Sequence, residues 1–315
     1  MDILSDTLLS EVFVVTWLAG TIRLAAPVLM AALGETIGEV SGVLNVGIEG
    51  TMLVGALAAF VAANETGSPV LALVMSVAVG LAVNLFLAWM YVTVQASQVV
   101  VGVVFNAAAL AAASYTFRAI YGSSPGILTV SGFRSVEIPL LHKIPILGGS
   151  VFTQSPLTYL TFALVFGVWV MLYRTRLGLA LQAVGDHPKM ADAAGLSVTK
   201  LRYLGVLASG AFSGCAGGFL LLTAAHTYRD TIISGKGFIA LAIVIFGAWN
   251  PARALWAALI FGAADSLQLS LQAAGYSVVP QLMFALPYLL TIVAVSGIFK
   301  RRTQPNALLL PYQRA

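Results

Sequence analysis

Charged residues are scarce in this chain, and cysteine is almost absent. Only 9% of its 315 residues are charged, whereas a soluble domain carries roughly a quarter. This scarcity excludes an ordinary water-soluble globular domain. The single cysteine, Cys215, excludes an intrachain disulfide and most cysteine-based metal sites. Its glycine and alanine neighbours predict a small residue packed between helices.

Motifs for nucleotide hydrolysis, metal binding and catalysis are missing as well. Because the chain has no G-x-x-x-x-G-K-[ST] motif, we expect any ATP hydrolysis to occur on a separate subunit. His187 and His226 have no second histidine or cysteine at ligand spacing, so we expect surface polar residues and no metal site. No nucleophile–base pair stands out, which disfavours an intramembrane enzyme. We predict a non-enzymatic protein without a cofactor.

Long apolar stretches take the place of these features. The chain is 59% hydrophobic with a mean hydropathy of +0.95, and about 20 helical residues suffice to cross the hydrocarbon core of a bilayer. We predict one all-α transmembrane domain over residues 1–315, a polytopic bundle of about 8–10 spans in a cell membrane. The spans are expected near residues 12–33, 43–63, 69–94, 98–121, 156–173, 203–222, 232–249, 252–272 and 277–298.

The basic residues predict the orientation of this bundle. They cluster in the loop 174–202, in the turn at Arg253 and in the C-terminal tail, which all fall on one side when the spans alternate. The positive-inside rule makes that side cytoplasmic, so the net charge of +4 points to topology and not to nucleic acid. The long loop 122–155 then lies outside. With nine spans the N-terminus also lies outside, and one additional segment would reverse it.

Glycine and carboxylates interrupt the apolar pattern in residues 38–60, GEVSGVLNVGIEGTMLVGALAAF. Lipid does not accept this mixture, so we predict a broken helix beside an aqueous pathway. We expect Glu35 and Glu39 to lie at the interface, among headgroups and water. For Glu49 we expect a position inside the protein, with a hydrogen bond to a neighbouring helix end favoured over a place on the pathway.

A second Gly-interrupted segment, 232–262, suggests an internal repeat of such broken helices, which often marks a transport pathway. Other polar residues fall within predicted spans, and a helix–helix hydrogen bond is the favoured interpretation of each. The alternative is that they line a substrate path. The candidates for that path are Asn45, Glu49, Asn84, Asn106, Asp265 and Gln268, with Gln95 and Gln272 as further intramembrane amides.

The cytoplasmic loop 174–202 contains a short predicted helix at 188–194, between Gly185 and Gly195. Pro188 suits its first turn, and Asp186 is a possible N-cap. Such a helix in a basic loop is a natural docking element for a soluble partner.

Three blocks of the sequence resemble one family. They are APVLMAALGETIGEVSGVLNVGIEGTMLVGA, TRLGLALQAVGDHPKMADAAGLSVTKLRYLGVLASGAFSGCAGGFL and GKGFIALAIVIFGAWNP. Together they resemble the permeases of ABC transporters for simple sugars and nucleosides, and the resemblance covers most of the chain. One departure is Val40, where that family often has a basic residue.

The resemblance implies a bacterial or archaeal cell-membrane protein with several partners. These are an ABC ATPase, a second permease that is a paralogue, and an extracytoplasmic substrate-binding lipoprotein. The coupling segment that meets the ATPase would comprise residues 185–195. Its polar residues are Asp186, His187, Lys189 and Asp192, and Gly195 ends it.

The short N-terminus and the outer loop look like the shorter permease of a nucleoside importer. A ribose-type monosaccharide permease is the alternative. A third possibility is an ion-coupled secondary transporter that uses Glu49 and Asp265 as ion sites.

Overall fold

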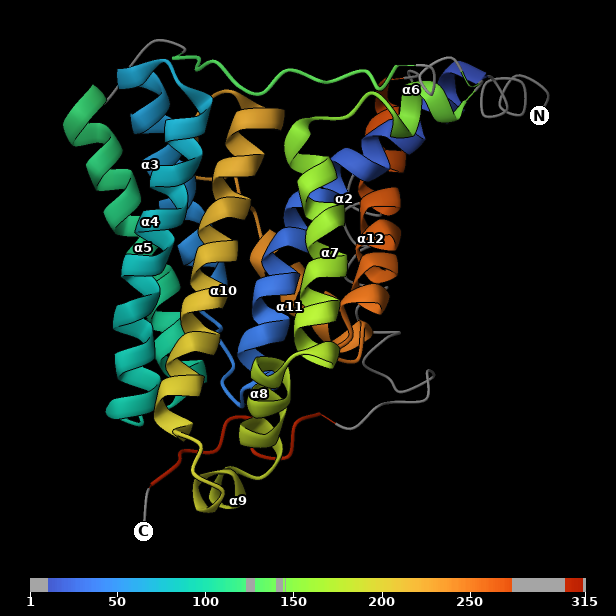
Figure 1. The fold of residues 1–315 in the computed structure, drawn as a ribbon. Helices are drawn as coiled ribbons and strands as arrows, with labels where there is room; N and C mark the ends of the chain where they lie inside the picture. Colours follow the sequence, from blue (N-terminus) through green and yellow to red (C-terminus); the bar gives the residue numbers. More distant parts are fainter. Residues whose placement is uncertain (1–10, 123–127, 140–143, 145, 274–303, 314–315) are drawn as a thin grey trace.

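The chain folds into a bundle of helices that run roughly parallel to one another (Figure 1). The structure is a computed structural model, and it describes residues 11–122, 128–139, 144, 146–273 and 304–313. The predicted span at 277–298 lies outside these residues. Within them, seven helices are long and apolar enough to cross a membrane.

The seven long helices confirm the all-α polytopic prediction. They are α2 (Glu11–Val40), α3 (Ile48–Thr66), α4 with its π-helical end η1 (Pro69–Ala88, Trp89–Thr93), α5 (Gln98–Tyr121), α7 (Pro156–Arg174), α10 with its π-helical end η3 (Val198–Leu220, Leu221–Ala225) and α12 (Pro251–Ala273). The shorter helices are α6 (Leu147–Val151), α8 (Arg176–Asp186), α9 (Pro188–Ala193) and α11 (Lys236–Phe246).

Local sequence signals begin several of these helices. Ser68 caps α4 by accepting a hydrogen bond from the backbone N–H of Leu71 at 3.4 Å, and Pro69 occupies the first helical turn. Thr175 separates α7 from α8 and caps α8 through Gly178, whose N–H lies 3.2 Å from the hydroxyl oxygen. The chain therefore leaves the membrane at the end of α7 and starts a new helix without a long linker.

Helix α2 forms the centre of the bundle. All of its residues from Ala25 to Val40 are buried, and it packs against α10, α12, α11 and α7. A helix that is buried on every side belongs in the core of a large bundle and not on a lipid-facing surface.

The first break in the helical pattern lies within the predicted segment 38–60, but the helix before it extends beyond the predicted span at 12–33. Helix α2 continues to Val40, the chain is irregular over residues 41–47, and α3 starts at Ile48. Glu35 and Glu39 therefore lie within a central helix, with exposed fractions of 0% and 2%. Our expectation of an interfacial position for both was wrong. Hydrogen-bond partners inside the protein replace the water that both oxygens of Glu35 and one oxygen of Glu39 would otherwise need.

The second break turns the predicted span at 232–249 into a half-helix. Helix α11 has 11 residues, and at 1.5 Å per residue it rises only about 16 Å, roughly half of the hydrocarbon core. Residues with positive φ flank it, namely Ser234 (47°) and Gly235 (84°) before it and Ala248 (49°) and Trp249 (56°) after it. A complete span at 232–249 is therefore wrong, whereas the predicted interruption is confirmed.

Small residues bring α10 very close to α3 and α4. A Cβ atom added to Gly217 of α10 would lie 1.9 Å from the carbonyl oxygen of Met52 in α3. One added to Gly80 of α4 would lie 2.4 Å from the carbonyl oxygen of Gly210. Cys215 packs as a half-buried free thiol against the main core, as predicted.

The two ends of the bundle differ in the loops that they carry. The basic loop with α8 and α9 lies at one end (Figure 1). The positive-inside rule predicts that this end is cytoplasmic, so we call it the cytoplasmic end and the opposite one the outer end. Residues 128–139 run extended across the opposite, outer end. Backbone hydrogen bonds hold this outer segment, including one of 2.9 Å from the Val130 N–H to the His226 carbonyl oxygen and one of 3.0 Å from the Ile138 N–H to the Phe152 carbonyl oxygen.

Candidate functional site

Glu49 lies at the N-terminus of the half-helix α11. Its Oε1 accepts a hydrogen bond from the backbone N–H of Gly235, and its Oε2 accepts one from Gly237, both at 2.7 Å. A carboxylate at a helix N-terminus satisfies unpaired N–H groups and interacts favourably with the helix dipole. The approach is close, since a Cβ atom on Gly237 would lie 2.6 Å from the Cα atom of Glu49. Glu49 thus makes the hydrogen bond to a neighbouring helix end that the sequence favoured.

A lysine joins Glu49 and Asp265 in one charged group. Lys236, the first residue of α11, lies within electrostatic range of both carboxylates. All three side chains are partly exposed. The structure therefore brings together two of the predicted path residues and adds Lys236, which the sequence analysis did not select. The sequence signal that could have identified Lys236 was the presence of a lysine inside an apolar segment.

Asn45 and Asn84 belong to a closed polar network at the first break. Glu35 Oε1 accepts from the Asn45 backbone N–H at 2.8 Å, and Glu35 Oε2 accepts from the Ser209 hydroxyl at 2.6 Å. The Asn45 side-chain amide donates to Asn84 Oδ1 at 2.7 Å and to the Ser209 hydroxyl oxygen at 3.0 Å. Asn84 Nδ2 in turn donates to the hydroxyl oxygen of Thr51 at 3.0 Å. All five residues are 0% exposed, so this network fastens the break to α4 and α10.

Asn106 of α5 connects the end of the same break to the first turn of α3. Its Oδ1 accepts from the Gly50 N–H at 2.8 Å, and its Nδ2 donates to the Val46 carbonyl oxygen at 2.9 Å. Such a side chain satisfies backbone groups that the broken helix leaves unpaired. Gln268 of α12 is 7% exposed. Gln268 is thus enclosed, whereas Asn106 is partly exposed but uses its amide group on the backbone of the break.

Glu39 connects the first break to the second. Its Oε2 accepts a hydrogen bond of 2.7 Å from the indole N–H of Trp249. Its Oε1 is buried and has no hydrogen-bond partner within the part of the chain that the structure describes. Trp249 was not among the sequence-based candidates, since its partner lies 210 positions away.

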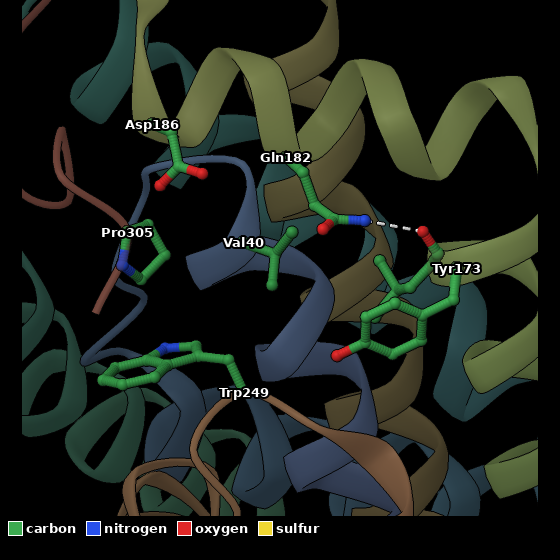
Figure 2. Close-up of a pocket in the computed structure, with 7 residues that line it drawn as sticks. Val40, Tyr173, Gln182, Asp186, Trp249 and Pro305 are labelled. Carbon is green, nitrogen blue, oxygen red and sulfur yellow. Dashed lines mark hydrogen bonds between the residues drawn. The ribbon is translucent and has the colours of Figure 1, made fainter. Parts of the chain in front are cut away.

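A small pocket of about 50 Å³ opens at the cytoplasmic end beside this contact (Figure 2). Figure 2 shows Asp186 and Gln182 of α8 on one side and Trp249 on the other, with Pro305 of the C-terminal tail beside them. Gln182 Nε2 donates to the Leu172 carbonyl oxygen at 2.6 Å, which fixes the angle between α7 and α8.

The predicted coupling residues surround the short helix α9. Asp186, His187 and Lys189 are exposed, Asp192 is half-buried, and Gly195 ends the segment with a φ of 86°. The predicted helix at 188–194 is observed as Pro188–Ala193.

Asp186 does not cap α9, contrary to our expectation. The N-cap position is His187 and has no side-chain cap. Asp186 is the last residue of α8, and its Oδ1 accepts a hydrogen bond of 3.3 Å from the backbone N–H of Asn306. The C-terminal tail therefore takes the contact that we assigned to α9.

Aromatic rings gather at the outer end, next to the outer segment. Phe60 of α3 packs against Phe117 and Tyr121 of α5, with ring centroids 5.7 and 5.5 Å apart, and against Tyr228 at 6.0 Å. Burial, together with the charge of Asp230, raises the pKa of the Tyr228 phenol above its usual value. Among the described residues, no three histidine, cysteine, aspartate or glutamate side chains cluster as a metal site would require.

Comparisons with known proteins give consistent results over nearly the whole chain. Residues 17–295 match the family model described as branched-chain amino acid transport system / permease component. The guanosine ABC transporter permease protein NupQ of Bacillus subtilis is 39% identical over 93% of this chain and 94% of its own length. TsgC13 of Haloferax volcanii, named provisionally as a glucose ABC transporter permease protein, is 35% identical over 94% and 97%. The nucleoside ABC transporter permease protein NupC of Lactococcus lactis is 32% identical over 90% and 92%.

Proposed function

Because the chain belongs to the branched-chain amino acid transport system / permease component family, we propose that it is the membrane-spanning permease of an ABC importer for nucleosides. The observation that carries this proposal is its similarity to the guanosine permease NupQ over 93% of the chain. In the described part of the chain, seven helices long and apolar enough to cross a membrane and two helix breaks fit a transport subunit. Family membership also favours this function over an ion-coupled secondary transporter.

A nucleoside is the proposed cargo, and a monosaccharide is the second candidate. The similarity to TsgC13, at 35% identity, is the observation that favours a sugar. The two are separated by uptake of radiolabelled guanosine, adenosine and ribose in cells with and without the gene. We expect loss of nucleoside uptake with ribose uptake intact. The reverse pattern would assign the chain to the sugar branch, and a defect in efflux alone would refute an importer.

The cargo path is proposed to pass the charged group formed by Glu49, Lys236 and Asp265. These side chains are partly exposed, whereas Asn45 and Asn84 are fully enclosed by their own network. Ionisable residues inside a membrane protein usually face a cavity or the interior. We expect Asp265→Asn to change the affinity for nucleoside in uptake assays, and Asn84→Asp to reduce the amount of folded protein instead.

Energy is proposed to enter through an ABC ATPase that docks on residues 185–195. Most of this segment is exposed at the cytoplasmic end, and its short helix α9 projects beyond the ends of the long helices (Figure 1). Replacing Asp186 and Asp192 with lysine reverses the charge of its polar rim. We expect weaker copurification of the ATPase with unchanged membrane insertion.

Glu65→Lys is the matched control for this test. It reverses one carboxylate at the exposed outer end of α3, far from any cytoplasmic partner, so ATPase copurification should stay unchanged. Equal copurification from the Asp186 and Asp192 variants would place the ATPase elsewhere on the chain.

The outer loop 122–155 is proposed to receive a substrate-loaded lipoprotein, and a paralogous permease is proposed to complete the pore. The described part of the loop 122–155 lies at the end opposite to α8 and α9 (Figure 1). Mass identification of the proteins that copurify from the native membrane tests both partners. A complex that contained neither a second permease nor a binding protein would contradict this assembly.

A further inference from the structure

Residues 305–313, which we call the C-terminal strap, lie across the cytoplasmic end of the bundle (Figure 1). At its start, the backbone N–H of Ala307 donates to the Gly185 carbonyl oxygen at 2.8 Å. The N–H of the neighbouring Asn306 donates to Asp186 Oδ1 at 3.3 Å. Ala307 is only 4% exposed. The strap is thus attached to the point where α8 passes into the proposed coupling segment.

The far end of the strap is attached to a different part of the bundle. Arg202 Nη1 of α10 donates to the Leu310 carbonyl oxygen at 2.8 Å. Gln95, in the turn between η1 and α5, donates through Nε2 to the Tyr312 carbonyl oxygen at 2.7 Å. Its Oε1 accepts from Gln313 Nε2 at 3.0 Å. One short segment therefore connects the coupling segment with the inner end of α5.

Two observations show that these attachments constrain the chain. Arg202 is 2% exposed, and its Nε and Nη2 have no hydrogen-bond partner among the described residues. Its guanidinium therefore depends on the hydrogen bond from Nη1 to the Leu310 carbonyl oxygen of the strap. Gln95 and Leu309 have φ values of 59° and 67°. Non-glycine residues keep such conformations only where the surrounding structure imposes them.

The strap also lines two hollows of the cytoplasmic surface. Pro305 lines the pocket shown in Figure 2. Tyr312 lines a groove together with Asp192 and Gly195 of the coupling segment, and its ring packs against a cluster that includes Val184. A change in the position of residues 185–195 must therefore displace the strap.

We propose that the C-terminal strap is a positioning element of transport, which transmits displacement of the coupling segment to the turn between η1 and α5. This inference rests on the proposed function, in which an ATPase moves residues 185–195. In it, Gln95 and Arg202 act as positioning residues that anchor the strap to α5 and α10.

The test introduces a carboxylate at a buried position of the strap and at an exposed position three residues earlier. Ala307→Asp places the new charge on the buried strap residue, and Gln304→Asp places the same group on the exposed residue that precedes the strap. A chain that ends after residue 304 lacks the strap. The variant Gln95→Ala keeps the strap but removes its far anchor. Each is assembled with the ATPase, the partner permease and the binding protein in vesicles, and nucleoside uptake is measured per ATP hydrolysed.

We expect Ala307→Asp, Gln95→Ala and the truncated chain to keep ATPase copurification and ATP hydrolysis, while nucleoside moved per ATP falls severalfold. Gln304→Asp should match the unaltered protein. A folding defect would lower uptake and hydrolysis together and leave their ratio unchanged, so the ratio separates positioning from simple stability.

Two results would overturn the proposal. One is an unchanged ratio in the truncated chain and in Ala307→Asp. The other is loss of ATPase copurification in Ala307→Asp, which would make the strap part of the docking surface instead. Failure of the proposed function has a different signature, because the unaltered protein would then neither copurify with an ATPase nor import nucleosides, and the strap proposal would fall with it.

Discussion

Replacing Glu49 separates two ways of losing its contact with α11. Glu49→Gln keeps a carbonyl oxygen that can accept one of the two N–H groups, but it directs an amide N–H₂ toward the other. Glu49→Leu removes both acceptors and leaves the N–H groups of Gly235 and Gly237 without their partners. We therefore expect the glutamine variant to be the milder of the two.

The magnitude follows from the two 2.7 Å hydrogen bonds. A hydrogen bond to a charged group contributes about 1.5–3 kcal/mol, and a buried donor left unsatisfied costs about 1–3 kcal/mol. Glu49→Gln loses one such bond, so we expect a loss of about 2–3 kcal/mol in the free energy of unfolding. Glu49→Leu loses both, and we expect about 3–6 kcal/mol, near the upper end for a single substitution.

Thermal unfolding in detergent measures this difference, with the surviving monodisperse protein followed by size-exclusion chromatography. Glu65→Gln and Glu65→Leu are the matched controls, because Glu65 lies on the same helix and is exposed. We expect the unfolding temperature to fall in the order parent, Glu49→Gln, Glu49→Leu, with both Glu65 variants close to the parent.

Equal unfolding temperatures for Glu49→Leu and the parent would refute the anchoring of α11 by this carboxylate. Equal losses for Glu49→Gln and Glu49→Leu would refute the hydrogen-bond argument specifically, since the amide would then provide no acceptor at α11.

Two further substitutions test the close packing and the link between the breaks. Gly217→Ala places a Cβ atom 1.9 Å from the backbone of α3, and we expect overpacking to lower the free energy of unfolding by about 1–3 kcal/mol or more. Its control is Gly167→Ala on α7, where a Cβ atom meets nothing within 4 Å. This variant should unfold no earlier than the parent in the same detergent assay. Trp249→Phe removes the N–H that donates to Glu39, and we expect it to cost about 1.5–3 kcal/mol. Trp256→Phe, at a side chain that is 68% exposed, is its control, and equal unfolding temperatures for the two tryptophan variants would show that the contact with Glu39 contributes nothing.

Features that depend on local sequence could be predicted. Apolar length indicated the helical class, because a bilayer imposes it on any chain that crosses it. The orientation that the basic loops indicate stays a prediction. Glycine clusters indicated the two breaks, and the short helix at 188–193 followed from Pro188 and its flanking glycines. These signals act over a few residues and need no knowledge of the tertiary structure.

Contacts between distant parts of the chain could not be predicted in the same way. Glu35 was expected in water because a carboxylate in lipid is costly, but its acceptor oxygens are used by Asn45 and by Ser209, which is 174 positions away. The strap contact from Gln95 to Tyr312 spans 217 positions. Periodicity contains no information on which remote side chain will satisfy a buried group.

Lys236 illustrates a less severe limit on prediction from the sequence. Its position in an apolar segment was visible, but its meaning depends on Glu49 and Asp265, which come from two other helices. A single charge in a predicted span indicates only that a partner or a cavity must exist.

The two helix breaks gain a physical connection that their sequence similarity alone does not provide. Carboxylates on either side of the first break hold both ends of α11: Glu49 binds the N–H groups at its start, and Glu39 binds Trp249 just after its end. A motion that separated α11 from residues 39–49 would leave these groups unpaired inside the protein, at a cost of roughly 1–3 kcal/mol for each. We therefore expect helix α11 and the first break to move as one unit during a change of access, with the pathway opening at the boundary of this unit and not within it.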